Sequence, residues 1–354
     1  MKRKISFVLT MAALIMSLTD FSSLTDTDPL ESALLVSAMS IGQTDGEYDI
    51  GFIYADYSAE AGKNEYKIVK YSSDSVGGCI SGAERTLQAK IYFGQMDAVF
   101  IEMDVFGDEK IYRDVINCLE RNPYMGYSIY VYGFDGDIDE FNGKIEEKDE
   151  KYVKFLEDII IREPMKGAFD AHLLDIVSAY SDYAIPVITP LGDDMVGKMY
   201  VMNGNKYISQ ADSGYFRPYG ILNDIDGRYY YETPLGEFYT DKVRTRMSYD
   251  GGMSVTVFVD IDFSSMYLNG YTSLQGKMIS VSERQFSEAV KKDIYGLIDH
   301  MKRSRCDMTG IKEYMHRFHN AEYADMMQSG RDIVTDGYFE VVVRSKFINN
   351  GVMY

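Results

Sequence analysis

Cysteine and histidine are scarce in this sequence: three cysteines and four histidines occur among its 354 residues. Cys79, Cys118 and Cys306 form no C-x-x-C pair, which excludes a disulfide-rich scaffold. Cys79 and Cys118 fall on the apolar faces of expected helices, and Cys306 falls between two expected helices. We therefore expect the three thiols to act as small buried hydrophobic groups.

Positive charge is scarce as well. The chain has 36 lysines and arginines against 55 acids, a net charge of −19, and the acids are spread along the whole sequence. A nucleic-acid-binding surface requires clustered positive charge, so we expect no nucleic-acid partner. Direct adhesion to anionic lipid headgroups is disfavoured for the same reason. The acids favour solubility but identify no substrate.

Motifs of catalytic and phosphate-binding sites are missing too. The sequence contains no G-x-S-x-G, no G-x-x-x-x-G-K-[ST] and no H-E-x-x-H. Acids are so numerous that a glycosidase-like pair could be assembled from many positions. We therefore expect no catalytic residue, no cofactor-binding residue, no metal ligand and no cofactor. An acid-rich hydrolase stays an alternative, which two carboxylates converging in a cleft, one with a raised pKa, would favour.

The spacing of the histidines does not predict a metal site. His316 and His319 are three residues apart on an expected helix, a spacing that suits two metal ligands. Because no third ligand completes the set, we expect a solvated, partly packed helix face. His172 adjoins an apolar stripe, so it is interpreted as a residue at the boundary between the buried and exposed faces of a helix. His300 is interpreted as an ordinary helix-face residue.

One acidic stretch resembles a calcium loop. Asp135, Asp137, Asp139 and Glu146 occupy positions 1, 3, 5 and 12 of an EF-hand. However, Glu140 stands at position 6, where the sharp turn requires glycine, and a strand rather than a helix is expected before the loop. We therefore expect an acidic turn followed by a helix N-terminus, where negative charge is favourable.

The N-terminus has the pattern of an export signal. Lys2, Arg3 and Lys4 precede an apolar stretch, Ile5–Leu18, which suits a signal-peptide core and is short for a membrane span. The small residues that follow match a cleavage site poorly. Residues 1–24 are therefore interpreted as a signal peptide or an N-terminal anchor.

Apolar residues make up 46% of the chain, including 30 tyrosines and 18 phenylalanines, enough to build real cores. The first region, residues 28–190, reads β-β-α-β-α-β, followed by more helix and an extended segment. Asp45-Gly46 suits a hairpin turn, Gly94 suits the C-terminal end of a helix, and Asp108 suits the N-cap of the next helix. Strands are expected over Leu34–Ile41, Tyr48–Tyr57, Asp97–Glu102 and Tyr127–Tyr132. Helices are expected over Ser75–Phe93, about 109–122, about 153–160 and Phe169–Ser181. An extended segment is expected over Tyr183–Pro190.

The second region, residues 198–354, begins with hairpins at Asn203-Gly204 and Asp250-Gly251-Gly252. Ser282 and Gln285 suit a capping box. Helices are expected over Glu283–Arg305 and Ile311–Phe318, and a closing strand over Tyr338–Ile348. The sequence thus predicts an α+β protein of two or three modules, each a mixed β-sheet covered by amphipathic helices.

Several stretches, taken in order, resemble the Ger(x)C family, the C subunits of spore-germination nutrient receptors. The resemblance covers most of the chain after residue 30, with residues 137–200 only loosely covered. The stretches are "ESALLVSAMSIGQTDGEYDI", "ERTLQAKIYFGQMDAVFIE", "VINCLERNPYMGYSIYVYG", the D-x-x-G turn in "DMTGIKEYMHRFHNAEYADMM", and "YFEVVVRSKFINNGVMY".

The resemblance implies a non-enzymatic, extracytoplasmic subunit of a germinant receptor, beside integral-membrane A and B subunits at the outer face of the inner spore membrane. The family usually carries a lipobox cysteine after the leader, but Ser17–Asp28 contains none, so lipidation through a thioether is impossible. Attachment would then require an uncleaved leader or membrane partners. The alternative is a secreted or membrane-tethered ligand-binding protein of the cell envelope unrelated to spores, which a tyrosine-lined pocket would favour.

Overall fold

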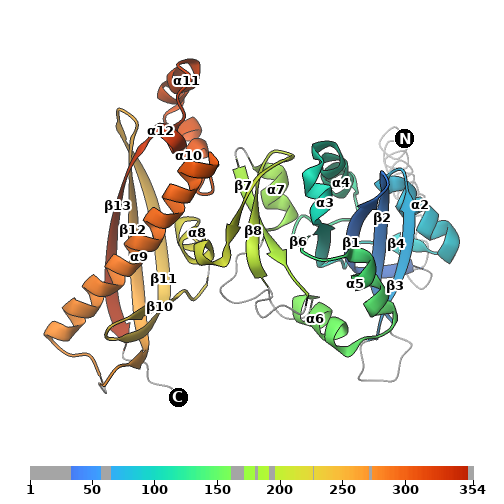
Figure 1. Ribbon diagram of the computed structural model, residues 1–354, viewed down its shortest axis with the longest axis horizontal. Coiled ribbons are helices and arrows are strands. Elements are labelled where there is room, and N and C mark those ends of the chain that lie inside the picture. The colour runs from blue at the N-terminus through green and yellow to red at the C-terminus, as the bar shows by residue number, and fades with distance from the viewer. Residues whose placement is uncertain are drawn as a thin grey trace, which may run out of the picture.

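The computed structural model describes residues 33–56, 65–160, 171–179, 182–190, 196–225, 227–270 and 273–349. The expected leader, residues 1–24, lies outside these ranges, as do Ser17–Asp28 and the expected helix start at Phe169. Among the described residues, no helix combines the length and apolar content that a membrane span requires. Figure 1 shows an elongated molecule, with the N-terminal half at one end and the C-terminal half at the other.

A nine-stranded mixed sheet forms the N-terminal module, in the order β3-β2-β1-β5-β6-β7-β8-β9, with β4 paired to the start of β1. The central pairs β1–β5, β5–β6 and β6–β7 are parallel, and the outer pairs are antiparallel. The strands are β1 (Ala33–Thr44), β2 (Glu47–Asp56), β3 (Glu65–Ser73), β4 (Lys90–Tyr92), β5 (Ala98–Glu102), β6 (Tyr130–Phe134), β7 (Asp182–Ile188), β8 (Val196–Asn203) and β9 (Lys206–Asp212).

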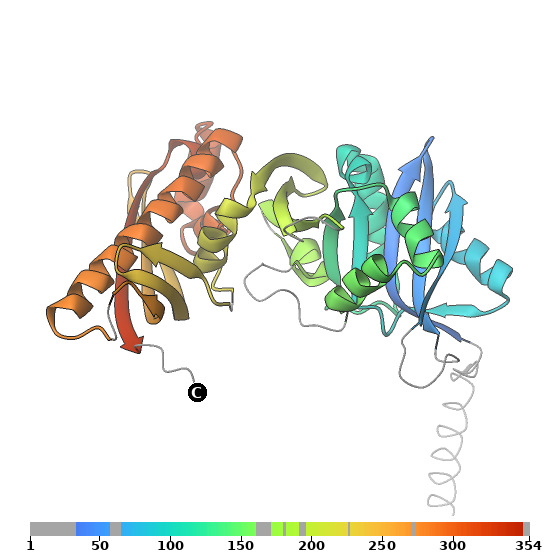
Figure 2. The same ribbon diagram turned by 60° about the horizontal axis from the view of Figure 1, so that its bottom comes forward.

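Helices cover both faces of this sheet, as its buried parallel centre requires. Residues of α2 (Val76–Leu87), α3 (Met103–Gly107), α4 (Glu109–Arg121) and α7 (Leu173–Ser178) share one hydrophobic core with the sheet. The other face packs against α5 (Ile138–Glu146) and α6 (Glu150–Ile160), which lie in front of the sheet in Figure 2. Successive residues of β5 alternate accordingly: Val99 and Ile101 belong to the first core, and Phe100 to the second.

A four-stranded sheet, β10-β11-β12-β13, forms the C-terminal module. β10 (Tyr230–Thr233), β11 (Gly236–Gly251) and β12 (Ser254–Leu268) are antiparallel, whereas β13 (Tyr338–Asn349) is parallel to β12. The long helix α9 (Lys277–Ser304) lies diagonally across one face (Figures 1 and 2). The remaining elements are η3 (Ser213–Tyr215), α8 (Phe216–Leu222), α10 (Ile311–Phe318), α11 (Asn320–Gln328) and α12 (Ile333–Asp336).

The apolar stripe of α9 supplies the core of this module. Its members are fully buried, and each contributes roughly 1.5–3 kcal/mol by leaving water. The Phe286 ring stacks on Phe263 of β12, with centroids 4.1 Å apart. The stripe consists of Phe286, Val290, Ile294, Leu297, Ile298 and Met301, as its spacing predicted.

The opposite face of the four-stranded sheet is exposed, and oppositely charged side chains lie next to each other on its neighbouring strands. Arg244, Asp260 and Arg344 lie side by side in register across β11, β12 and β13. The next row holds Lys242, Asp262 and Lys346, and Arg246 reaches Asp260 at 2.8 Å. Five cations therefore gather on one sheet face of a strongly acidic chain: Lys242, Arg244, Arg246, Arg344 and Lys346.

Several predicted element boundaries in the N-terminal half are wrong. The helix predicted over Ser75–Phe93 ends at Leu87, because Gln88 adopts a left-handed conformation (φ 51°), and Ile91 lies in β4 instead. Gly94 is therefore not the helix stop. The helix predicted from Phe169 to Ser181 is described only as α7, Leu173–Ser178.

Two further differences concern strands. The strand predicted from Tyr127 begins at Tyr130 and continues to Phe134 as β6, and strand β3 was not predicted at all. By contrast, the hairpin through Asp45-Gly46 is confirmed, as is the strand predicted over Asp97–Glu102, which begins one residue later, at Ala98. The Asp108 cap is confirmed by bonds from the Lys110 and Ile111 amides.

In the C-terminal half, the predicted capping box is wrong. α9 begins at Lys277, five residues before Ser282, whose buried hydroxyl donates to the Ile279 carbonyl inside the helix. Both hairpins form, but the first turns at Gly204-Asn205, because Asn203 pairs with Lys206. Helix Ile311–Phe318 and the closing strand are confirmed.

The two sheets confirm the predicted α+β class of mixed sheets covered by helices. The hairpin of β8 and β9, which the sequence analysis placed in the second region, is hydrogen-bonded to β7 and so belongs to the first sheet. The division of the chain into residues 28–190 and 198–354 stays a proposal.

The contact between α2 and β3 yields a stability prediction. A Cβ at Gly82 would lie 2.1 Å from Cε1 of Tyr71, whereas one at Gly77, in the same helix, would meet nothing within 4 Å. We expect Gly82→Ala to lower the free energy of unfolding by about 1–3 kcal/mol, because the tyrosine ring must move. Gly77→Ala should leave it unchanged or slightly higher. Urea unfolding of both variants measures this, and equal effects would contradict the packing described.

Candidate functional site

The loop between α9 and α10 is built around one buried carboxylate. Asp307 accepts hydrogen bonds from the backbone N–H groups of Thr309 (3.1 Å), Ile311 (3.1 Å) and Lys312 (2.6 Å). These bonds satisfy amides at the start of α10, as a helix cap does. Gly310 has φ 70°, which suits glycine. The D-x-x-G turn found in the sequence is therefore a capping structure.

Asp182, at the start of β7, ties this loop to the N-terminal sheet. Its buried carboxylate accepts hydrogen bonds from the Asp307 backbone amide and from the Asn203 side chain of β8. The Lys312 ammonium lies 3.9 Å from Asp182 and 3.2 Å from Asp332. We call Asp182, Asp307, Lys312 and Asp332 the junction cluster, because it links the two modules.

Burial and neighbouring polar groups act in opposite directions on two members of the junction cluster. Burial raises the pKa of Asp307, although the backbone hydrogen bonds and Lys312 act in the opposite direction. Burial also lowers the pKa of Lys312, but the carboxylates of Asp182, Asp332 and Asp307 outweigh that effect and raise the net pKa. Lys312 therefore supplies a stable positive charge among three carboxylates.

Apolar contacts reinforce the junction. Ala184 and Met199 of the first sheet belong to the same buried cluster as Ile221, Met308 and Met315 of the C-terminal half. Beside them lies a cavity of about 400 Å³ that residues of both halves line, among them Asp182, Tyr219 and Arg317. Sequence reasoning missed this site, because Asp182 and Asp307 are 125 residues apart and neither belongs to a known paired motif.

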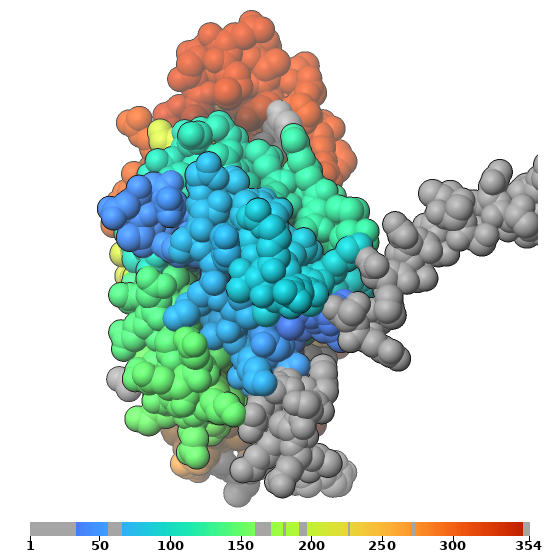
Figure 3. All heavy atoms as spheres, turned by 90° about the vertical axis from the view of Figure 1, so that its right-hand side faces the viewer, coloured from blue at the N-terminus to red at the C-terminus, as the bar shows by residue number. Residues whose placement is uncertain are grey.

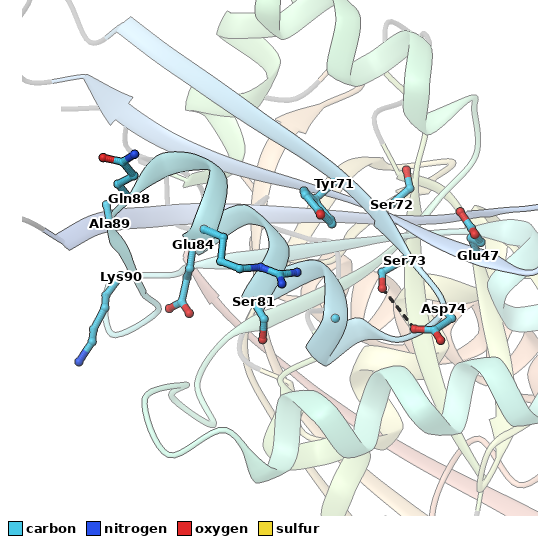
Figure 4. Close-up of a pocket in the computed structure, with 12 residues that line it drawn as sticks. Glu47, Tyr71, Ser72, Ser73, Asp74, Ser81, Glu84, Gln88, Ala89 and Lys90 are labelled. Carbon is cyan, nitrogen blue, oxygen red and sulfur yellow. Dashed lines mark hydrogen bonds between the residues drawn. The ribbon is translucent and has the colours of Figure 1, made fainter.

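Two hollows flank the C-terminal end of α2, at the end of the molecule that Figure 3 presents. The first is an open polar groove of about 920 Å³ along α2 and the end of β3. Figure 4 shows Glu84, Gln88 and Lys90 at one end and Ser73 and Asp74 at the other. The Ser73 hydroxyl bonds to Asp74 at 3.3 Å.

The second hollow is a more apolar cavity of about 800 Å³ between α2, β4 and the C-terminal end of α4. Its aromatic walls include Tyr92 and Tyr124, whose ring centroids are 6.3 Å apart. Glu84 and Lys90 border both hollows. The segment Glu84–Phe93 thus contributes walls to two surface depressions.

The histidines have identifiable packing roles. The His172 ring lies 4.5 Å from that of Tyr130, and its Nδ1 is 3.0 Å from the Ser128 carbonyl oxygen, as expected of a boundary residue. His300 packs against Tyr215, and burial lowers its pKa. His319 follows α10, with Nε2 3.3 Å from the Tyr314 hydroxyl. In the described ranges, no three His, Cys, Asp or Glu side chains form a metal-binding group.

The residues of the calcium-like pattern do not form a loop. Asp137 caps α5, accepting from the amides of Asp139 and Glu140, which is the acidic helix start that was expected. Asp135 pairs with Lys198 at 2.7 Å. Glu146 is the last residue of α5 and pairs instead with Lys70, at 3.2 Å.

One small acidic hollow bears on the hydrolase alternative. Glu102, Asp104 and Asp137 line a space of about 190 Å³, and burial raises the pKa of Glu102. The Glu102 carboxylate is already bonded to the Ile138 amide at 3.1 Å. The space is also smaller than the roughly 300 Å³ at which ligand pockets begin. Glu102 and Asp137 therefore bind amides at the start of α5.

The cysteines behave as expected. Cys79 and Cys306 are fully buried, Cys118 is half-buried, and all three are free. Burial raises the pKa of each thiol, to about 11 for Cys79, so the three groups are poor nucleophiles.

The junction cluster predicts a large effect of a single substitution. Asp182→Ala removes the acceptor of two hydrogen bonds and leaves Lys312 short of a carboxylate, so we expect the free energy of unfolding to fall by about 3 kcal/mol. Asp260→Ala, which removes an exposed ion pair with Arg246, should cost less than about 1 kcal/mol. Urea unfolding compares them, and similar losses would contradict the role assigned to Asp182.

The raised pKa of Lys312 gives this contribution a pH dependence. Its stabilising charge is fully present below the unfolded pKa of 10.5 and is lost as pH rises through the higher folded pKa. We expect Lys312→Met to destabilise the protein by about 3 kcal/mol at pH ~8, with a smaller difference from the wild type near pH ~11.5. An equal difference at the two pH values, measured by urea unfolding, would refute this charge effect.

Comparisons with known proteins agree with the two-part architecture. Residues 26–191 match the spore germination protein N-terminal domain, and residues 200–351 match the spore germination B3/GerAC-like C-terminal domain. The crystal structure of the GerBC protein shares the fold, with a TM-score of 0.56 and 11% identity over 88% of this chain and 97% of that chain. No curated protein matches. Because the two matched domains follow one another over most of the sequence, the chain belongs to the Ger(x)C, or GerAC-like, family of spore germination proteins.

Proposed function

We propose that this protein is a non-enzymatic, extracytoplasmic C subunit of a spore germinant receptor, required for nutrient-triggered germination at the membrane. The observation that carries the proposal is the match of both halves, in order, to spore germination domains. The partners would be the integral-membrane A and B subunits, and the location the outer face of the inner spore membrane. The proposed regions are residues 1–24 as signal peptide or anchor, then 28–190 and 198–354.

The exposed face of the four-stranded sheet supports a role in protein contacts. α9 covers one face, whereas the other presents five cations beside Asp260, Asp262 and Glu340. β13 is an edge strand of 12 residues, and side chains of α9 accept hydrogen bonds from two of its edge amides, those of Val341 and Phe347. A rigid, charged sheet face suits recognition of an acidic partner surface, since complementary charge speeds and orients association.

The proposal is tested by genetics in the source spores. Deletion should abolish germination in response to nutrients while spore formation continues, and the wild-type chain should restore the response. Spores of a deletion strain without a second gene copy that germinate normally would contradict the proposal. Fractionation should find the chain with spore membranes, and its complete release as a soluble protein would contradict the location.

Rescue with charge variants identifies the contact surface. The double variant Arg244→Gln, Arg344→Gln should rescue poorly, because it removes two exposed cations of the sheet face. Lys110→Gln with Arg113→Gln, on the exposed side of α4, is the matched control and should rescue fully. Equal abundance of the variants in spores shows that a difference comes from contact and not from folding.

A further inference from the structure

The 800 Å³ cavity has the size and walls of a small-molecule site. Two segments far apart in the sequence meet there: the end of α2 with β4, and the end of α4 with the turn that follows it. Its volume lies within the roughly 300–1,000 Å³ typical of ligand pockets, which are mostly apolar with a few polar groups. The apolar lining includes Ile80, Ile91, Tyr92, Phe93, Pro123 and Tyr124.

The charges at the cavity favour an anion. Arg121 and Lys90 line it against one carboxylate, that of Glu84, in a chain with net charge −19. Glu84 already accepts a hydrogen bond from the Ile91 amide at 3.1 Å. Among the described residues, no side chain forms an ion pair or hydrogen bond with Arg121, which is exposed at the last position of α4. A planar guanidinium suits bidentate binding of a carboxylate.

The aromatic walls favour a flat or branched apolar body. Tyr92 and Tyr124 present rings tilted by 48°, and Tyr124 is 63% exposed, so its ring is accessible at the entrance. Phe93 and Ile91, which also line the cavity, are buried. An aromatic ligand between these walls would gain both apolar burial and ring contacts.

We propose that this cavity binds a small amphipathic anion, with an aromatic or branched apolar body in the cavity and a carboxylate or similar group at Arg121. The proposal is independent of the role in germination, because it concerns binding by the purified protein. It assigns a function to the segment Glu84–Phe93 and to the turn after α4, which the proposed receptor role does not use.

The cavity carries its own reporter, the half-buried thiol of Cys118, which lines it. Cys79 and Cys306 are fully buried and serve as internal controls for unfolding. A molecule in the cavity should slow alkylation of Cys118 by N-ethylmaleimide, measured by mass spectrometry of each cysteine peptide. Because burial raises the pKa of the Cys118 thiol, alkylation is followed at alkaline pH.

The test uses two related probes on the purified chain: anionic 8-anilinonaphthalene-1-sulfonate and its uncharged analogue N-phenyl-1-naphthylamine. We expect both to bind and to protect Cys118. Arg121→Gln should weaken the anionic probe roughly fivefold and leave the neutral probe unchanged, because a partly exposed ion pair contributes modestly. Arg85→Gln, an exposed arginine of the neighbouring groove, is the matched control and should change neither affinity.

The outcomes separate clearly. Loss of anionic-probe affinity in Arg121→Gln alone, with protection of Cys118, supports the proposal. Binding without protection of Cys118 places the probe elsewhere and overturns it. Equal affinity of the wild type and Arg121→Gln for the anionic probe overturns the assignment of an anion. Failure of both probes to bind the folded wild-type chain overturns the site itself.

Discussion

The contact between Asp182 and the Asp307 loop is the constraint on which the arrangement of this molecule depends. A carboxylate of the first sheet accepts a backbone hydrogen bond from the second module, and Lys312 supplies the compensating charge. Burying the carboxylates of Asp182 and Asp307 would be costly without that ammonium and the amides at the start of α10. The same loop also caps α10. A change in this loop would therefore affect both the contact between the modules and the start of α10. Polar groups satisfied in this directional way specify one relative orientation, which apolar contact alone does not.

The proposed role, that of a subunit that acts through protein contacts, would require a fixed orientation between the modules. The exposed basic sheet face lies in the C-terminal module, whereas the aromatic cavity is lined by residues of α2 and β4. These two elements lie at the far end of the N-terminal module in Figure 1. A rigid joint would hold these two surfaces at a set distance, so a partner bound at one and a ligand bound at the other would keep a constant geometry. The Asp307 turn, which the sequence shows as one of the recognisable family features, thus acquires a physical role.

Much of this fold follows from local sequence signals. The α9 stripe, the Asp108 cap, the hairpin turns and the α+β class depend on spacing and capping, which act within a few residues. The errors arise where tertiary contacts decide. Apolar periodicity continues past Leu87, yet Ile91 pairs with β1, so a strand replaces the last predicted helical turn. Ser282 and Gln285 form a good capping pattern, but packing against the sheet extends α9 by five residues before it. The junction cluster and the cavity were beyond prediction because each unites segments distant in sequence.

Spin labels placed on the two modules would test the rigid joint most directly. Labels at Arg85→Cys, on α2, and at Arg344→Cys, on β13, occupy exposed positions in different modules, with Cys118 replaced by serine. Double electron–electron resonance should give one narrow distance distribution for the parent chain and a broader one when Asp182→Ala is added. A broad distribution in the parent chain, or an unchanged narrow one in the Asp182→Ala chain, would contradict the claim that this carboxylate fixes the orientation of the two modules.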